Sequence, residues 1–266
     1  MKKKKSLGQN FLKNKAVVVA MANRANLSPY DVVLEAGPGE GILTEELLKW
    51  AGKVIAVEKD NRLIPFLTQK FSSEISSGKL NLIHSDILHF DPLTYKLTNL
   101  KTYKLIANLP YYITGAFLKK FLSGNCQPSM MMLLLQKEVV KRIIARDGKE
   151  SILSISVKAY GAPRLIKKVP AGSFAPAPKV DSAVLLIDNI SKQFFDGFSE
   201  EEFFQVVKTA FAHKRKRLAG NLKTLYPQIE SALEKLNIPK NARAENISLG
   251  DWKKLTIQLK TTPVHK

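Results

Sequence analysis

The chain has 266 residues, of which 45% are hydrophobic and 24% are charged. These values are typical of water-soluble globular proteins, so they exclude a wholly disordered, a collagen-like and a membrane-spanning chain. Lys and Arg number 42 against 23 Asp and Glu, and the net charge of +19 is far more than solubility needs. It indicates a polyanionic partner, with nucleic acid as the first candidate and an anionic membrane surface as the second.

The N-terminal segment and the cysteine content both argue against secretion. Met1 and Lys2 to Lys5 are not followed by the apolar segment of a signal peptide. The single Cys126 cannot form an intramolecular disulfide and offers no thiolate cluster to a metal. We therefore expect a cytoplasmic protein without a metal site, in which Lys2 to Lys5 form either a mobile arm or a solvated tail.

Short apolar runs alternate with helical patterns in the first half of the chain, at residues 32–34, 54–57, 80–83, 104–107 and 130–135. This alternation predicts an α/β fold with a doubly wound, mostly parallel sheet that helices cover on both faces. Two later runs, Ile152 to Val157 and Ala183 to Ile187, are expected to be additional strands at the sheet edge.

The pattern becomes helical after Asp188. Apolar residues recur at helical spacing from Phe203 to Leu222 and again from Ile229 to Leu236. We therefore expect an α/β domain over residues 1–190 and a small all-α domain over residues 191–266, with the boundary near Ile190 to Gly197.

A glycine-rich segment, Glu35-Ala36-Gly37-Pro38-Gly39-Glu40-Gly41, follows the first expected strand. Glycines let the backbone turn sharply and approach a ligand at the N-terminus of the helix expected over Ile42 to Trp50. The spacing is G-x-G-x-G and not the G-x-G-x-x-G of dinucleotide-binding loops. It is typical of the S-adenosylmethionine loop of class I methyltransferases, although a merely structural turn has the same appearance.

Acidic residues end the next two strands. Glu58, 21 residues after Gly37, is placed to accept hydrogen bonds from two ribose hydroxyls, and Asp86 is placed to accept from an adenine amino group. A strand-terminal acid is by itself more often a solvated cap or an ion-pair partner. Because parallel strands end at the same edge of the sheet, the glycine loop and both acids together predict a nucleoside site.

The segment Asn108-Leu109-Pro110-Tyr111 ends the fourth strand. An adenine amine is a poor nucleophile because its lone pair is delocalised into the ring, so an alkylating enzyme must draw the lone pair back onto nitrogen. The side-chain oxygen of Asn108 and a main-chain carbonyl at Leu109 or Pro110 can each accept one amine hydrogen. Pro110 stiffens the loop, and Tyr111 offers a ring for stacking on an extruded base. The alternative is a proline turn with an ordinary core tyrosine.

Four motifs in this order closely resemble those of the ribosomal RNA adenine dimethyltransferases, in particular the KsgA type: Gly8 to Leu12, Glu35 to Gly39, Asn108 to Tyr111 and Phe174 to Val184. The resemblance covers nearly the whole chain. It implies a class I, Rossmann-like methyltransferase domain with a small C-terminal all-α domain that binds RNA. The implied activity is dimethylation of the 6-amino groups of two adjacent adenines in the 3′-terminal hairpin of small-subunit (16S) ribosomal RNA. The implied setting is ribosome biogenesis, with a pre-30S particle as the substrate; a monomer is the default expectation.

The resemblance also implies roles for individual residues. The S-adenosylmethionine contacts would be Asn10, Leu12, Gly37, Gly39, Glu58, Asp86 and Asn108, and the catalytic loop would be Asn108, Leu109, Pro110 and Tyr111. Phe174 would be a second aromatic face against the target base, and its place in a Pro-braced loop favours exposure. The chain departs from the family at Lys13-Asn14, where an Asp is frequent, and at Gly115-Ala116, where Ser, Thr or Pro is common.

The basic surplus is most concentrated in His213-Lys214-Arg215-Lys216-Arg217, which continues the helical pattern of Phe203 to Phe211. A charge run is often only a solvated face, and such 5-mers also resemble nuclear localisation signals. Because lysine and arginine neutralise phosphates, we expect Lys214, Arg215, Lys216 and Arg217 to form one wall of an RNA groove.

Three other functions compete with this interpretation. A nicotinamide-dependent oxidoreductase would use the glycine loop and Glu58, but it leaves Asn108 to Tyr111 unexplained. A non-enzymatic RNA-binding or transcription factor on the same fold would not need the intact catalytic loop. A large-subunit ribosomal RNA adenine methyltransferase that confers antibiotic resistance is similar in sequence, but the complete Gly8 to Leu12 and Phe174 to Val184 motifs favour the small subunit.

Overall fold

The computed structural model describes residues 10–94 and 102–261, so Lys2 to Lys5, Gly8 and Gln9 lie outside the described residues. The chain divides into two compact units. The first comprises Met1–Val140 and Gly161–Ile190, and the second comprises Lys141–Tyr160 and Ser191–Lys266. The units therefore differ from the expected domains 1–190 and 191–266 in the segment Lys141–Tyr160, which joins the C-terminal residues. The functions assigned to the two domains stay predictions.

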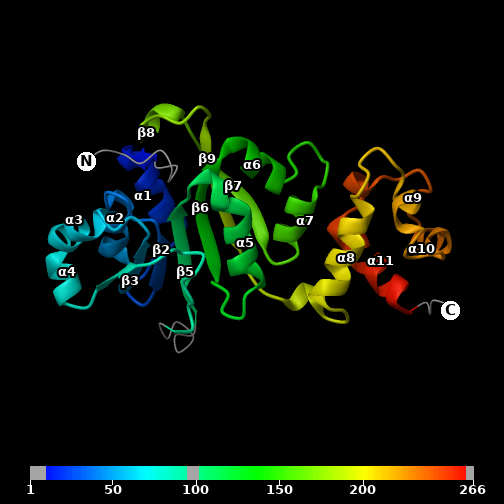
Figure 1. The fold of residues 1–266 in the computed structure, drawn as a ribbon, viewed down its shortest axis with the longest axis horizontal. Coiled ribbons are helices and arrows are strands. Elements are labelled where there is room, and N and C mark those ends of the chain that lie inside the picture. The colour runs from blue at the N-terminus through cyan, green and yellow to red at the C-terminus, as the bar shows by residue number, and fades with distance from the viewer. Residues whose placement is uncertain (1–9, 95–101, 262–266) are drawn as a thin grey trace. The chain divides into compact units, whose positions relative to one another are not determined.

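A seven-stranded sheet organises the first unit, in the order β4-β3-β2-β5-β6-β9-β7 (Figure 1). The five strands from β4 to β6 are parallel, β9 runs antiparallel to β6, and β7 runs antiparallel to β9. The strands are β2 (Val32–Ala36), β3 (Lys53–Glu58), β4 (Leu80–His84), β5 (Lys104–Asn108), β6 (Met130–Gln136), β7 (Ala162–Val169) and β9 (Ser182–Asp188). The order reverses between β2 and β5, and ligands of open parallel sheets bind beyond the carboxyl ends of the strands at such a point.

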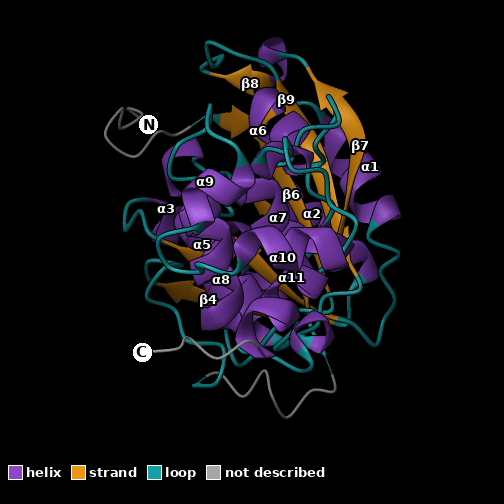
Figure 2. Cartoon of the chain, turned by 90° about the vertical axis from the view of Figure 1, so that its right-hand side faces the viewer, coloured by secondary structure: helices purple, strands orange, loops and turns teal. Residues whose placement is uncertain are grey.

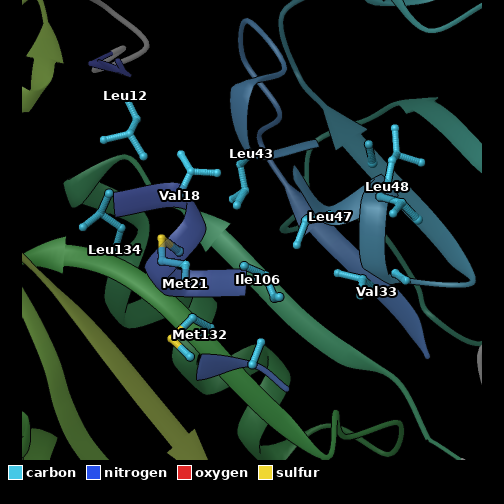
Figure 3. Packing of buried hydrophobic residues seen from close by; sticks show 14 of the residues in the cluster. Leu12, Val18, Met21, Val33, Leu43, Leu47, Leu48, Ile106, Met132 and Leu134 are labelled. Atoms are coloured by element: carbon cyan, nitrogen blue, oxygen red, sulfur yellow. The ribbon is translucent and has the colours of Figure 1, made fainter. Parts of the chain in front are cut away.

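The helices of the first unit are α1 (Lys15–Arg24), α2 (Ile42–Trp50), α3 (Leu63–Lys70), α4 (Ser72–Ser76) and α5 (Thr114–Ser123). The sheet is buried on both faces, because consecutive residues of β2 and β6 are buried and not only alternate ones. The main core cluster joins one face of the strands to α1, α2 and α3. Figure 3 shows Met21 of α1 near Ile106 and Met132 of the strands. The expected doubly wound α/β architecture is confirmed.

Asn14 begins helix α1. Its side chain accepts a hydrogen bond from the backbone N–H of Ala16 at 3.0 Å. Asn and Asp are both favourable at this position because either can accept from the exposed amides of the first turn. Asn14 therefore caps α1 at the position where the sequence departs from the family.

Two strand predictions at the sheet edge are wrong. Residues Ile152 to Val157 form not a strand but helix α7 (Ile152–Lys158), because Ser151 and Ser154 form a capping box that begins a helix there. Residues Ala183 to Ile187 do form a strand, but β9 lies inside the sheet between β6 and β7. The edge strand is β7, which contains Pro163, Lys167 and Lys168 and a register shift after Leu165. Proline, lysine and bulges are typical of edge strands, where they prevent further pairing.

A separate two-stranded sheet joins two motifs that lie far apart in the sequence. Strand β1 (Phe11–Leu12) pairs antiparallel with β8 (Phe174–Ala175), with Leu12 opposite Phe174. Lys13 adds a backbone hydrogen bond to the carbonyl of Ser173 at 2.8 Å. The N-terminal motif is therefore held against the Pro-rich motif.

The second unit is built from helices and loops in its described part (Figure 2). Its C-terminal helices are α8 (Glu200–Ala210), α9 (Leu218–Leu222), α10 (Ile229–Lys235) and α11 (Leu249–Thr261), and α6 (Lys137–Ile143) leads into it from β6. A buried aromatic cluster around Phe195 and Phe203 forms part of its core. The small all-α domain expected near the C-terminus is thus present as helices. Among the described residues, no helix is both long and apolar enough to cross a membrane.

Candidate functional site

A cleft in the first unit lies beyond the carboxyl ends of β2, β3 and β5. It contains about 1120 Å³ of empty space, including the part that is open to solvent, which is sufficient for a nucleoside-sized ligand. Its wall contains every cofactor-binding and catalytic residue that the sequence predicts: Asn10, Leu12, Gly37, Gly39, Glu58, Asp86, Asn108, Leu109, Pro110, Tyr111 and Phe174. The structure therefore brings these residues to one place, and their roles stay predictions.

The glycine loop between β2 and α2 has a conformation that favours glycine. Gly37 and Gly39 have φ values of 72° and 60°, in the left-handed region that side chains disfavour. A Cβ atom on Gly39 would also lie 3.0 Å from the ring of Phe11. The loop therefore presents bare backbone to the cleft and leaves room for strand β1 against it.

Glu58 ends strand β3 and holds the glycine loop. Its Oε2 accepts a hydrogen bond from the backbone N–H of Gly39 at 3.1 Å, and its Oε1 accepts from the N–H of Asp60 at 2.7 Å. The residue is only 6% exposed. Burial raises the pKa of Glu58 above its usual value, and the two N–H donors partly offset this effect. Each carboxylate oxygen retains a lone pair with which it could accept a ligand hydroxyl.

Asp86 follows strand β4 and is paired with Lys59. Its Oδ2 accepts from Lys59 Nζ at 2.8 Å, and its Oδ1 accepts from the N–H of Leu88 at 2.9 Å. Burial disfavours the charge, but the hydrogen bonds from Lys59 and Leu88 outweigh it and lower the pKa of Asp86. Asp86 is therefore an ionised acceptor at neutral pH.

Asn108 ends strand β5 and is oriented by the N-terminal motif. Its Nδ2 donates a hydrogen bond to the main-chain carbonyl of Asn10 at 3.3 Å. This contact fixes the plane of the amide group and leaves the acceptor Oδ1 without a donor among the described residues. Asn10 therefore determines which atom of Asn108 is available to a ligand.

The loop after Asn108 distinguishes the two main-chain acceptors that the sequence left open. The carbonyl of Pro110 already accepts the N–H of Ile113 at 3.2 Å, in the short 3₁₀ turn η3 (Tyr111–Ile113). Thr114 Oγ1 donates to the carbonyl of Tyr111 at 3.1 Å. These bonds make the carbonyl of Leu109 the better candidate for a substrate acceptor.

The two aromatic residues proposed for base stacking differ in accessibility. Tyr111 is half-buried, and its hydroxyl is 2.8 Å from Ser182 Oγ at the start of β9. Phe174 is only 6% exposed, so the expectation that its Pro-braced loop leaves it exposed is wrong. Its pairing opposite Leu12 places the ring within the main core cluster, although it still contributes to the cleft wall.

Glu35 lies in β2 directly before the glycine loop and is fully buried. Neither of its carboxylate oxygens has a hydrogen-bond partner among the described residues, and the same is true of Thr44 Oγ1 nearby. Burial raises the pKa of Glu35 to about 8, with a smaller contribution from the neighbouring Glu58. Glu35 is therefore mostly a neutral acid at pH 7.

The basic residues lie in the second unit, where their local structure departs from the prediction. Helix α8 ends at Ala210, so Lys214, Arg215, Lys216 and Arg217 do not continue it but form an exposed turn before α9. We refer to Lys214–Arg217 as the basic turn. The buried Asn221 anchors it, because its Nδ2 donates to the carbonyl of Ala210 at 2.6 Å and of His213 at 3.1 Å.

Several residues of the cleft wall were missed by the sequence analysis. Phe11, Lys59, Ile87 and Tyr112 also line the cleft. Each is a direct neighbour of a predicted residue, and this adjacency was the available signal. Whether such a neighbour faces the cleft or the core depends on loop geometry, which the sequence pattern does not specify.

Comparison with known proteins links this geometry to characterised sequences. Residues 1–261 match the family described as Ribosomal RNA adenine dimethylase. A protein from Dehalococcoides mccartyi named Ribosomal RNA small subunit methyltransferase A is 43% identical, and the match covers 99% of this chain and 90% of the relative. A protein of the same name from Clostridium botulinum is 36% identical over 95% of this chain and 92% of the relative.

Two solved structures have the same fold over nearly the whole chain. The 23S rRNA methyltransferase ErmE is 26% identical, with a TM-score of 0.78, and the match covers 95% of this chain and 100% of that one. A dimethyladenosine transferase from Plasmodium falciparum is 25% identical, with a TM-score of 0.79, over 92% of this chain and 95% of that one. Both matches extend beyond the sheet into the C-terminal helices.

Proposed function

The chain belongs to the ribosomal RNA adenine dimethylase family, and we propose that it dimethylates the 6-amino groups of two adjacent adenines in the 3′-terminal hairpin of small-subunit ribosomal RNA. The methyl donor is S-adenosylmethionine. The observation that carries the proposal is that Asn108, a side-chain acceptor for an amine, lines the same cleft as Glu58 and Asp86, the acceptors for a nucleoside.

The residues of the cleft fit S-adenosylmethionine. Glu58 would accept hydrogen bonds from the ribose hydroxyls, and the ionised Asp86 would accept from the adenine amino group. The bare backbone at Gly37 and Gly39 permits close approach at the N-terminus of α2, where amides favour the carboxylate of the amino-acid part. Asn10 and Leu12 would complete the site from strand β1. When bound, the cofactor supplies a methyl group on a sulfonium sulfur.

Two acceptors would activate the target amine. We infer that Asn108 Oδ1 and the carbonyl of Leu109 each accept one of its hydrogens, which draws the lone pair onto nitrogen and directs it along the line of transfer. The alkylated amine is acidic and loses its proton to water, so no general base is needed. In the second transfer only one hydrogen remains, so the monomethylated adenine is held by one bond fewer.

The target adenine would leave its stack and enter the cleft beside Tyr111. The hydrogen bond between the hydroxyls of Tyr111 and Ser182 restrains the orientation of this ring. Pro110 limits the backbone freedom of the loop. Phe174, which is mostly buried but lines the cleft, would bound the base pocket from the side of strand β8.

The small subunit is favoured over the large subunit by the curated relatives. Those at 36–43% identity carry small-subunit names, whereas the large-subunit enzyme ErmE is 26% identical. We further propose that the substrate is the RNA in a pre-30S particle, that the protein acts as a cytoplasmic monomer, and that Lys214, Arg215, Lys216 and Arg217 bind RNA phosphates. The net charge of +19 supports an RNA partner.

The decisive experiment is transfer of labelled methyl from S-adenosylmethionine to small ribosomal subunits that lack this modification. Large subunits and mature small subunits are the controls, and nucleoside analysis identifies the product. Dimethyladenosine in unmodified small subunits alone is the expected result. Label in large-subunit RNA would assign the protein to the resistance enzymes, and cofactor binding without transfer would favour a non-enzymatic RNA-binding protein.

A further inference from the structure

An exposed aromatic ring stands at the cleft next to the catalytic loop. Tyr112 follows Tyr111 in η3, lines the cleft, and is nevertheless 63% exposed. Single exposed aromatics are common on protein surfaces, so exposure alone carries no function. Tyr30 is an example, since it is 96% exposed but precedes β2 and therefore lies at the other end of the strands. Tyr112 differs from it because it is exposed beside the proposed site of chemistry.

Two other rings of the cleft, those of Tyr111 and Phe174, are already engaged. The hydroxyl of Tyr111 is bonded to Ser182, and Phe174 is 6% exposed within the core cluster. These rings can bound one base inside the cleft. An RNA strand that delivers one base into the cleft continues on either side of it, and its next nucleotides lie at the mouth. Tyr112 offers an open aromatic face to them.

A cation lines the same cleft as this ring. Lys59 lines the same cleft, and its side chain is 54% exposed. Asp86 is the main cause of its raised pKa, and Tyr112 makes a smaller electrostatic contribution. Ion pairs at the protein surface contribute little to stability, so Lys59 can exchange Asp86 for a phosphate at little cost. An exposed ring for a base and an ammonium for a phosphate in one cleft are the groups that bind single-stranded nucleic acid.

We propose that Tyr112 is an RNA-contact residue whose ring stacks on the base of a nucleotide next to the target adenine, while Lys59 faces the adjoining phosphate. The proposal rests on the proposed function, because it assumes an RNA strand that places a base in the cleft. It assigns Tyr112 to the binding of the substrate and not to methyl transfer or to cofactor binding.

The test compares four variants of the full-length protein in steady-state methylation of unmodified small subunits. Tyr112→Phe retains the aromatic face, Tyr112→Leu retains only the apolar bulk, Tyr112→Ala removes both, and Tyr30→Ala is the matched control. Alanine substitution of a stacked aromatic costs about 1–3 kcal/mol per base, so we expect the KM for RNA to rise about five- to a hundredfold for Tyr112→Ala and Tyr112→Leu. We expect Tyr112→Phe and Tyr30→Ala to remain within about twofold of the wild type.

Two further measurements, of kcat and of cofactor affinity, distinguish the possible outcomes. In the expected result, kcat at saturating RNA and the Kd for S-adenosylmethionine, measured by calorimetry, stay at the wild-type values. An unchanged KM for Tyr112→Ala would overturn the proposal, and a parallel loss of cofactor affinity would assign Tyr112 to the cofactor site instead. If the wild-type protein itself methylates no RNA, the proposed function fails, and the proposal fails with it for that separate reason.

Discussion

In the cleft of the first unit, Asn108, Glu58 and Asp86 are each held by a hydrogen bond of 3.3 Å or less to a neighbouring group. In the basic turn of the second unit, the four cationic side chains are exposed, and no described carboxylate pairs with them. The cleft therefore specifies positions of atoms, whereas the turn specifies only a local density of charge. Chemistry on one amine needs the first kind of site, and binding to a phosphate backbone needs only the second.

Replacing Asn108 should have the largest effect of any single change. Asn108→Ala removes an acceptor aimed at the target amine, and loss of one such preorganised partner costs about 10²–10³ in kcat. RNA affinity should change little, because the amide is one contact in a large interface. Single-turnover methylation and RNA binding, measured on the same preparation, check both statements.

The matched control is Asn81→Ala, an exposed asparagine on β4 of the same sheet. It should leave both quantities unchanged. If Asn108→Ala kept the wild-type turnover, the acceptor mechanism would be wrong. Activity in the cleft would then not depend on an acceptor atom at a fixed position.

The buried Glu35 predicts a pH-dependent stability. Its folded-state pKa of about 8 lies above the usual value of 4.5, so the folded state binds the proton more tightly than the unfolded state. Its neutral form is retained in the folded protein below pH 4.5 without penalty, and stability is lost as the pH rises from 4.5 to 8. The side chain introduced by Glu35→Gln is neutral at all pH values. The free energy of unfolding of this variant, relative to that of the wild type, should therefore increase by about 1.4 kcal/mol per pH unit in this window.

Urea unfolding from pH 5 to pH 9 measures this difference. Glu45→Gln is the control, since Glu45 is an exposed carboxylate on α2, and its difference from the wild type should stay flat. A flat difference for Glu35→Gln as well would mean that an internal partner, and not burial alone, satisfies the carboxylate.

RNA binding by the basic turn should depend on the charge of its side chains and not on their exact positions. Replacing Lys214, Arg215, Lys216 and Arg217 together with Ala should weaken RNA binding about tenfold or more and flatten its salt dependence, because each phosphate contact contributes about 0.7–0.9 to the slope of log K against log salt. S-adenosylmethionine affinity should stay unchanged. Filter binding at several salt concentrations gives both numbers.

A charge-matched control separates the site from the net charge of the protein. It replaces four exposed lysines elsewhere in the second unit, Lys208, Lys223, Lys235 and Lys240, with Ala. If this variant lost as much affinity as the first, the surplus charge of the whole surface would bind the RNA, and the basic turn would have no special role.

The parts of the cleft that the sequence could predict are those that lie next to one another along the chain or at the ends of strands. The glycine loop, Glu58, Asp86 and Asn108 were located because each directly follows an apolar strand, and the ends of parallel strands meet at one edge. The pairing of Phe11–Leu12 with Phe174–Ala175 was not predicted, because it joins residues more than 160 positions apart and depends on register. The hydrogen bond from Asn108 to Asn10 follows from the same long-range closure.

Local sequence features explain the remaining errors in the predicted secondary structure. Residues Ile152 to Val157 alternate like a strand, but the capping box at Ser151 and Ser154 begins a helix instead. Strand β7 was not predicted, because an edge strand with Pro163 and Lys167 lacks the apolar pattern of a central strand. Charge alone located the basic turn, although its conformation was predicted as a helix.

Asn221→Ala tests whether the basic turn needs its conformation, and it should have the smallest effect on function. The change removes the donor to the carbonyls of Ala210 and His213, so it should lower the free energy of unfolding by about 1–3 kcal/mol. The RNA affinity of the folded protein should stay within about twofold, because phosphate contacts carry no sequence information and tolerate displacement of flexible cations. Urea unfolding and filter binding give the two values, with the exposed Asn246→Ala as control. An affinity loss as large as that of the four-residue variant would mean that the RNA reads the shape of the turn, and the contrast between a site of fixed atoms and a site of charge would then fail.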